Sequence, residues 1–263
     1  MRDCVGVGID ENGNVVNFHP RVHNLMVGMT RSGKSSLSMV ALWQTIGLNP
    51  SSVLITGWDP TGLLLTAFKK TGSEWISTGV DDESIDKAIH VLEKVVTLMH
   101  ERTAELLRQR RMKYDASDFD AHNPLIVVVL EEYQLGSLVA QSNRDRAKRL
   151  DSLVAQIATN GLKAGVSLLI LVQEANKALL GVTRPQMGAI YAMRLQKREE
   201  LAMILPEIQE SRMITKLAQA KPGQGYAITP DHRSPRFFRA YVTDETSYYD
   251  GVERDYRLPQ GVK

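Results

Sequence analysis

Hydrophobic residues along this chain follow two spacings, and their alternation predicts strands separated by helices. Short runs in which nearly every residue is apolar are typical of strands buried on both faces of a parallel sheet. Other segments carry apolar residues three and four positions apart, as the buried side of a helix does. The predicted strands are 24–27, 52–55, 125–130, 166–172 and 189–195, and the predicted helices are 34–46, a long one through 85–106 and one through 150–157.

The two ends of the chain predict antiparallel hairpins instead. Glu11-Asn12-Gly13 separates the alternating stretches 5–10 and 14–18, which is typical of an opening hairpin. Residues 225–242 resemble a closing pair of strands around a turn at 230–233. We therefore predict a single α/β domain with a mostly parallel sheet and helices on both faces. It would consist of a leading hairpin (1–22), a core (23–245) and a C-terminal tail (246–263).

Composition narrows the class of protein. The 263 residues are 43% hydrophobic and 24% charged, enough to bury one substantial core. Cys4 is the only cysteine, so an internal disulfide is impossible and a reducing, cytoplasmic location is expected. The sequence contains no apolar run of the ~18–20 residues that a spanning helix needs, and its start does not resemble a signal peptide. A net charge of +2 does not by itself indicate a nucleic-acid partner.

Residues 28–36, GMTRSGKSS, match the pattern G-x-x-x-x-G-K-[ST] of a phosphate-binding loop without a mismatch. The alternative is a plain glycine-rich turn, but a strand precedes this loop and a helix follows it. The helix would point its positive end at the phosphates. Lys34 would contact the β- and γ-phosphates, and Ser35 would bind Mg²⁺. The predicted cofactors are ATP and Mg²⁺, and the predicted nucleotide-binding residues are Gly28, Met29, Thr30, Arg31, Ser32, Gly33, Lys34, Ser35 and Ser36.

Three further polar residues lie at the ends of buried strands. Glu131 and Glu132 follow 125–130, where one carboxylate can hold the water shell of Mg²⁺ and its neighbour can polarise an attacking water. The alternative is a solvated strand end, where acidic residues are common. Gln173 follows 166–172, and its neutral amide is suited to sense the γ-phosphate or to orient water.

A series of motifs, in order, resembles the motor domain of the FtsK/SpoIIIE family of DNA-translocating ATPases. The phosphate loop with its preceding strands and the strand PLIVVVLEEYQ are similar to that family's nucleotide-binding entry and hydrolysis strand. The other similar segments are ITGWDPTG (55–62), LMHERTAELLRQRRMKY (98–114), IATNGLKAGVSLLILVQ (157–173) and KPGQGYAITPDHRSPRFFRAYVTDE (221–245). The resemblance covers roughly residues 5–245.

This resemblance implies a RecA-like core that assembles as a homo-oligomeric ring, commonly a hexamer, and threads double-stranded DNA. By motif it implies that Glu132 is the water-activating acid and Gln173 the sensor. Glu131 stands where the family usually has aspartate, which leaves its Mg²⁺-binding geometry open. Arg194 matches a family arginine on the following strand, so it is a candidate for the arginine that acts on a neighbouring subunit's nucleotide, and Arg184 is a second candidate. For each arginine the alternative is a surface salt bridge.

Charge placement is the remaining argument for a DNA partner. Residues 102–113 carry five basic residues against one acidic residue, and residues 144–149 carry four against one. Such clusters could follow phosphates without reading bases, or they could be solvated helix faces.

The predicted function is an ATP-hydrolysing, Mg²⁺-dependent, DNA-stimulated translocase without a membrane span of its own. Cell-division members of the family carry membrane spans and a DNA-orienting winged helix, so a stand-alone motor favours a mobile element such as a phage or plasmid. The alternatives are a protein-substrate secretion ATPase of the type VII kind, a conjugation coupling or viral packaging ATPase, and a nucleotide-binding assembly protein that hydrolyses little. A membrane or protein partner stays open.

Overall fold

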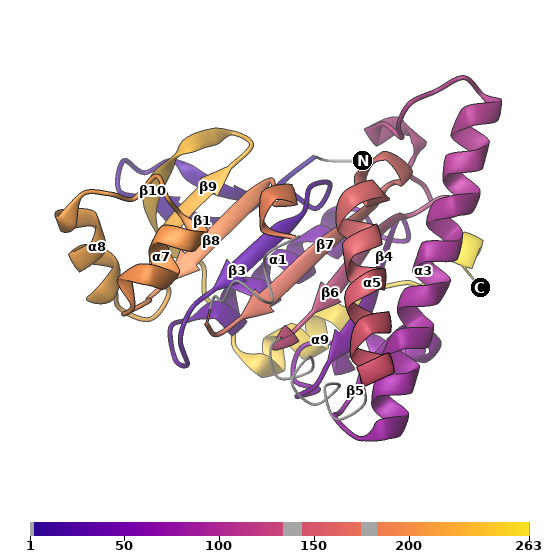
Figure 1. Ribbon diagram of the computed structural model, residues 1–263, viewed down its shortest axis with the longest axis horizontal. Coiled ribbons are helices and arrows are strands. Elements are labelled where there is room, and N and C mark those ends of the chain that lie inside the picture. The colour runs from indigo at the N-terminus through magenta and orange to yellow at the C-terminus, as the bar shows by residue number, and fades with distance from the viewer. Residues whose placement is uncertain (1–2, 134–143, 175–182, 263) are drawn as a thin grey trace.

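The computed structural model describes residues 3–133, 144–174 and 183–262, and within them the strands form one ten-stranded sheet. Across the sheet the strands follow the order β2-β1-β10-β9-β8-β3-β7-β6-β4-β5 (Figure 1). Their bounds are β1 Val5–Asp10, β2 Val15–Phe18, β3 Asn24–Val27, β4 Val53–Asp59, β5 Ile76–Thr78, β6 Leu125–Leu130, β7 Val166–Val172, β8 Ala189–Met193, β9 Gln224–Thr229 and β10 His232–Ala240.

The six strands from β8 to β5 are parallel, as their uniformly apolar sequences predict, and the other four are antiparallel. The two predicted hairpins form, β1 with β2 and β9 with β10. The turn of the closing hairpin is shorter than the predicted turn at 230–233, because His232 pairs with Thr229 and is therefore part of the strand. The hairpins also join each other: β1 pairs with β10, with Gly8 opposite Ala240. Residues from the two ends of the chain therefore build one half of the sheet together.

Helices cover both faces of the parallel half. On one face α3 (Asp82–Arg108) lies beside α5 (Arg144–Asn160), and on the other α1 (Lys34–Leu48) packs against α9 (Glu245–Asp255) (Figure 1). The short helix α2 (Lys69–Gly72) lies between β4 and β5 in sequence, and α7 (Arg198–Ile204) and α8 (Ser211–Ala218) connect β8 to β9. Asp81 caps the start of α3, accepting a hydrogen bond from the Ser84 amide.

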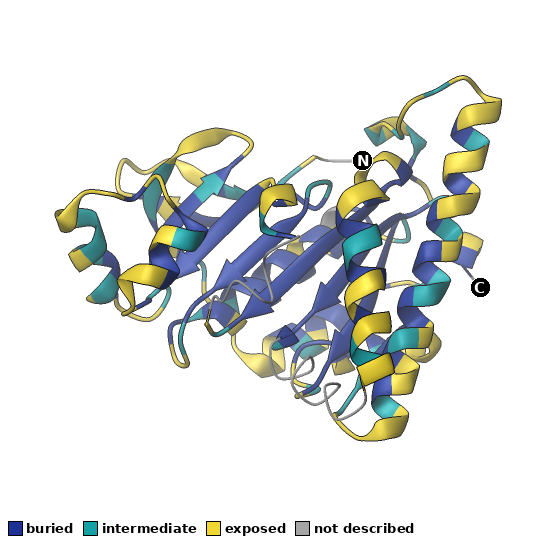
Figure 2. Ribbon diagram, viewed as in Figure 1, coloured by how far each residue is buried: buried dark blue, intermediate teal, exposed yellow. Residues whose placement is uncertain are grey.

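The core lies in two layers, one on each face of the sheet, because successive strand residues point to opposite sides. Leu25 and Val27 of β3 pack into the layer beneath α3 and α5, whereas Met26 packs into the layer beneath α1 and α9. The strands are buried throughout the parallel half, and the helices expose only their outer sides (Figure 2). Burial of each such side chain contributes about 1.5–3 kcal/mol, so these layers hold the sheet in place.

Several elements are absent from the sequence-based prediction: α2, β5, α7, α8 and α9. The predicted tail, 246–263, contains most of α9, which packs against α1. Tyr248 and Val252 are fully buried, and the Trp43 indole donates a hydrogen bond to Asp255. Within the described residues, no helix is long and apolar enough to cross a bilayer.

Candidate nucleotide-binding and catalytic site

The loop 28–33 lies at the carboxyl edge of the parallel strands, held by hydrogen bonds to the strands on either side of β3. The Gly28 amide donates to the Val172 carbonyl (3.2 Å) at the end of β7. The Met29 amide donates to the Arg194 carbonyl (3.1 Å) just after β8. Because β3 is flanked by both of these strands, the loop emerges at the centre of the sheet's edge, where α/β folds bind ligands.

Two glycines of the loop are required by close contacts. A Cβ on Gly28 would lie 2.6 Å from the Ser32 hydroxyl oxygen. Gly33 has φ +95° at the start of α1, and a Cβ there would lie 2.4 Å from the backbone nitrogen of Gly223. The Gly223 amide donates to the Ser32 carbonyl (2.8 Å), so the turn before β9 supports the loop from behind.

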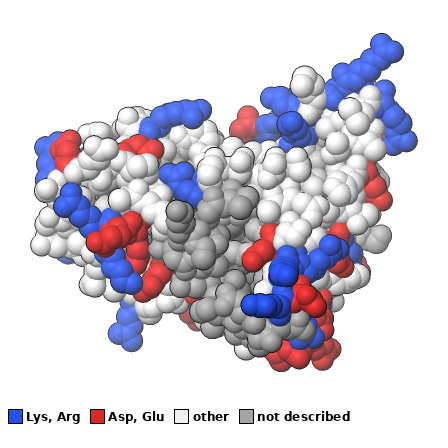
Figure 3. Space-filling model, in the orientation of Figure 1, with Lys and Arg blue, Asp and Glu red and all other residues white. Residues whose placement is uncertain are grey.

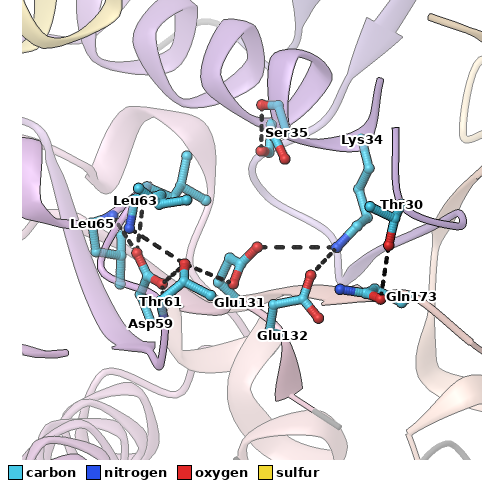
Figure 4. A network of polar contacts seen from close by, with 12 residues as sticks. Thr30, Lys34, Ser35, Asp59, Thr61, Leu63, Leu65, Glu131, Glu132 and Gln173 are labelled. Atoms are coloured by element: carbon cyan, nitrogen blue, oxygen red, sulfur yellow. Dashed lines mark hydrogen bonds and ion pairs between the residues drawn. The ribbon is translucent and has the colours of Figure 1, made fainter. Parts of the chain in front are cut away.

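Lys34 and the two carboxylates meet at this edge. Lys34 Nζ lies 3.0 Å from Glu132 Oε1 and 4.0 Å from Glu131 Oε1 (Figure 4). All three side chains are largely buried. Glu132 has φ +44°, so the chain leaves the strand conformation at this residue. Neighbouring side chains of a strand point to opposite faces, but Glu131 and Glu132 are not held to that rule. Both carboxylates therefore face the same lysine, as Figure 4 shows.

Burial is the main influence on Glu131 and raises the pKa of its carboxyl to about 8. Lys34 lowers this pKa, whereas the nearby charges of Asp59 and Glu132 raise it. Without a further cation, burial and the nearby charges of Asp59 and Glu132 outweigh the effect of Lys34, and Glu131 holds a proton at neutral pH. A divalent cation at this site would favour the ionised form of Glu131.

Asp59 is part of the site, although the sequence pattern assigned it no role. It ends β4, next to β6, and is fully buried. One carboxylate oxygen accepts from the amides of Leu64 and Leu65, and the other accepts from Thr61 and Gly62. The Thr61 hydroxyl also lies 3.5 Å from Glu131 Oε2. Asp59 thus shapes the loop 60–65 that faces Glu131, and its place at the end of a parallel strand was the available signal.

The predicted sensor also lies at the site. The Thr30 hydroxyl donates to Gln173 Oε1 (3.2 Å), which joins the tip of the phosphate loop to the end of β7 (Figure 4). Ser36, in contrast, bonds with the backbone of Thr243, so its hydroxyl is engaged by the segment after β10. Arg31 is exposed with φ +61°, and Ser32 is buried with a hydroxyl oxygen that has no hydrogen-bond partner among the described residues.

A cavity of about 280 Å³ brings these groups together. Its polar lining includes Ser35, Thr61, Glu131, Glu132 and Gln173, from four different segments of the chain. Hydroxyl and carboxylate oxygens are the ligands that Mg²⁺ prefers, and the start of α1 with Lys34 supplies positive charge for phosphate. The residues present therefore fit a magnesium–nucleotide complex, with Ser35 and Glu131 as the candidates for holding the metal.

The two candidate arginines differ. Arg194 follows β8 next to the phosphate loop of its own chain, and its Nε is buried without a hydrogen-bond partner among the described residues. The Arg184 guanidinium donates twice to the Ile204 carbonyl (3.0 and 2.6 Å), so it is bound within its own chain. Neither arginine lines the cavity described above.

Part of the two predicted basic clusters is paired or buried within the chain. Arg146 pairs with Asp82 and Asp86 of α3, and Arg149 pairs with Glu93. Arg102 is buried, and its guanidinium donates to the carbonyls of Ala164 and Pro124, which is a structural role.

Exposed basic residues of the two clusters lie at the end of α3 and just after it, and also on α5, where Arg144 and Lys148 are exposed. The first group consists of Arg108, Arg110 and Lys113, and of them Arg108 pairs with Glu105. Lys and Arg gather at that end of α3 at the upper right of Figure 3, whereas positive and negative groups intermingle near the start of α5. Within the described residues, the two predicted clusters therefore leave exposed basic residues at the end of α3 and at Arg144 and Lys148 of α5.

No protein-family model matches the sequence, and no curated protein matches it. Solved structures do match. The cytoplasmic domain of the type VII secretion ATPase EccC from Thermomonospora curvata superposes with a TM-score of 0.76 at 19% identity, covering 100% of this chain and 32% of that chain. The pCW3 conjugation coupling protein TcpA gives 0.75 at 15% identity, covering 97% and 70%.

A third similar structure is the genome packaging NTPase B204 from Sulfolobus turreted icosahedral virus 2, with a TM-score of 0.51 at 13% identity, covering 86% of this chain and 100% of that chain. The present chain thus spans about a third of the EccC domain and most of TcpA. At these identities the likeness concerns the fold. The predicted α/β fold with its mostly parallel sheet is confirmed, and this chain shares it with a secretion ATPase, a conjugation coupling protein and a genome packaging NTPase.

Proposed function

We propose that this chain is the ATP-hydrolysing motor domain of a DNA translocase of the FtsK/SpoIIIE type, active as a ring. The observation that carries the proposal is the meeting of Lys34, Glu131 and Glu132 at the mouth of a complete phosphate loop. Its fold is that of the secretion, conjugation and packaging ATPases, which supports nucleotide-driven transport as the general class.

Lys34 and Glu132 would exchange partners during the reaction. Nucleotide phosphate competes with Glu132 for the Lys34 ammonium, and the displaced carboxylate is then available to accept a proton from the attacking water. Bound Mg²⁺ would neutralise charge on the phosphates, with Ser35 and Glu131 holding it. Gln173, bonded to Thr30 of the loop, is placed to respond to the terminal phosphate.

The first experiment measures ATP hydrolysis with Mg²⁺, with and without long duplex DNA. Lys34→Ala should lower the rate by about 10²–10³-fold because a cation at the transferred phosphate is lost. Glu132→Gln should lower it by about 10²–10⁴-fold, as expected when a general base is removed, while nucleotide binding persists. Glu174→Gln is the matched control, since Glu174 is exposed and pairs with Lys197. Equal activity in the native chain and all three variants would refute the assignment.

The macromolecule that stimulates ATP hydrolysis identifies the cargo. The DNA assignment predicts a faster rate with duplex DNA and a larger particle mass with nucleotide and DNA than without them. Stimulation by a protein substrate but not by duplex DNA would favour a secretion ATPase, the alternative to which the EccC likeness points. Nucleotide binding with almost no hydrolysis under either condition would favour an assembly protein.

The neighbour-acting arginine belongs to the same proposal. Arg194 is the stronger candidate because Arg184 is already bound to the Ile204 carbonyl of its own chain. Mixing Arg194→Ala subunits with Glu132→Gln subunits tests it: partial recovery of hydrolysis would indicate that the arginine acts across an interface. No recovery would place Arg194 in its own subunit's site.

A further inference from the structure

A thiol, an imidazole and a carboxylate meet at the antiparallel half of the sheet, outside the nucleotide site. The potential metal-ligating atoms of Cys4, His19 and Asp231 all lie within 4.8 Å of one another. His19 Nε2 and Asp231 Oδ2 are 2.9 Å apart. Asp231 lies in the turn after β9, at the opposite end of that strand from Gly223, which contacts the phosphate loop.

Strand register brings these distant residues together. Val5 pairs with Phe18 in the antiparallel β1–β2 hairpin, so Cys4 and His19 are the next residues along and lie across from each other. β9 runs back along β8, with Ile228 opposite Ile190, and its end reaches the start of β8. There the Ala189 amide donates to the His23 carbonyl, so the turn after β9 meets the connection from β2 to β3.

Other contacts hold the three side chains in place. The Asn17 side-chain amide donates to Asp231 Oδ2 (2.9 Å), which orients the carboxylate. Arg21 pairs with Asp3, which ties the residue before Cys4 to the segment after His19. His19 is only 7% exposed, so its ring has little freedom to turn away.

The surroundings of the thiol are negative. Burial raises the pKa of Cys4, and the charges of Asp231 and Asp3 raise it further. These carboxylates disfavour a bare thiolate, but a divalent cation binding between the thiolate and Asp231 would reverse that effect. The sulfur, nitrogen and oxygen atoms that lie within 4.8 Å of one another are the ligand set of a divalent cation.

We propose that Cys4, His19 and Asp231 form a binding site for a zinc-class divalent metal ion, with water completing the coordination. Tetrahedral zinc places its ligand atoms about 3.3–3.6 Å apart. The three atoms lie within 4.8 Å of one another, so the group would contract around the ion while the 2.9 Å contact between His19 Nε2 and Asp231 Oδ2 opens slightly. Sulfur, nitrogen and oxygen ligands together favour zinc or cobalt over magnesium. On binding, the thiol proton is released to solvent. The ion would join the N-terminal segment to the β9–β10 turn.

Cobalt titration of the chain, freed of any affinity tag and kept reduced, provides the test. Since Cys4 is the only cysteine, a sulfur-to-cobalt charge-transfer absorption arises within one chain only if Cys4 binds the metal. Zinc should abolish this band by displacement. Zinc at 100 times its dissociation constant should raise the melting temperature by about 5 °C.

Variants separate this site from chance binding. Cys4→Ser should lose the charge-transfer band, and Cys4→Ser and His19→Ala should each weaken zinc binding at least about 10-fold. Asp231→Asn replaces an exposed side chain by one of the same shape. It tests the site even if a substitution at the buried His19 impairs folding. His232→Ala is the control, because this exposed neighbour lies outside the group and should bind zinc as the native chain does. Absence of the band, or equal zinc affinity in Cys4→Ser and the native chain, would overturn the proposal.

Discussion

Single residues at the strand ends set the chemistry of this chain, and Glu131 is the clearest case. Its carboxyl keeps a proton up to about pH 8 in the folded protein, whereas in the unfolded chain it ionises near 4.5. Between these values the unfolded chain has released a proton that the folded chain still holds, so the folded state loses stability as pH rises. The loss has a slope of at most about 1.4 kcal/mol per pH unit.

Glu131→Gln should therefore become more stable relative to the native protein as pH rises from 5 to 8, without nucleotide or Mg²⁺. The glutamine carries no proton to lose, so this pH dependence vanishes. Urea unfolding of both proteins at pH 5, 6, 7 and 8 measures the difference. A constant difference across this range would contradict the raised pKa of Glu131.

Asp59 governs the backbone at the same edge. Asp59→Ala would remove the side-chain acceptor of four backbone amides of the loop 61–65, of which the Gly62 amide keeps the Asp59 carbonyl as a second acceptor. This change should cost at least about 3 kcal/mol of unfolding free energy. Asp59→Asn is the matched variant, because it keeps one acceptor oxygen and the side chain's shape and should cost less. Denaturant midpoints of the two variants decide the point, and similar small losses would show that Asp59 does not hold the loop.

At the scale of elements, the contact between α1 and α9 reverses the usual preference for alanine over glycine within a helix. A Cβ on Gly251 would lie 2.2 Å from the Trp43 ring, whereas nothing lies within 4 Å of a Cβ on Gly47 of α1. Gly251→Ala should thus destabilise by about 1–3 kcal/mol despite alanine's higher helix propensity. Gly47→Ala should stabilise by about 0.5–1 kcal/mol. Thermal unfolding tests both changes, and a stable Gly251→Ala protein would mean that α9 does not pack closely on α1.

At the scale of the whole molecule, exposed basic side chains gather at the end of α3 and just after it, within the described residues. If this patch binds duplex DNA, the double variant Arg110→Ala/Lys113→Ala should bind DNA more weakly. Its slope of log K against log salt should be shallower by about 0.9 for each phosphate that the variant no longer neutralises. Arg146→Ala is the control, because Arg146 already pairs with Asp82 and Asp86. An unchanged salt slope in the double variant would mean that DNA binds elsewhere on the protein.

The sequence was sufficient wherever the residues that act together are neighbours in the chain. The phosphate loop is one continuous segment, and the buried parallel strands are largely apolar, so both could be predicted without coordinates. The strands around this loop could be predicted because each is a continuous apolar segment. Glu131, Glu132 and Gln173 could be predicted as site residues because they follow the ends of two of these strands.

Tertiary structure decided the remaining features, because they depend on residues far apart in sequence. The approach of the Asp59 loop to Glu131, the support of Gly33 by Gly223, and the burial of α9 against Trp43 all arise from sheet order and helix packing. Charge is the plainest example: residues 144–149 are a basic cluster in sequence, but in space α3 supplies the acidic partners of Arg146 and Arg149. Local pattern thus determined which candidate groups the chain carries, and packing determined which of them meet and which are neutralised.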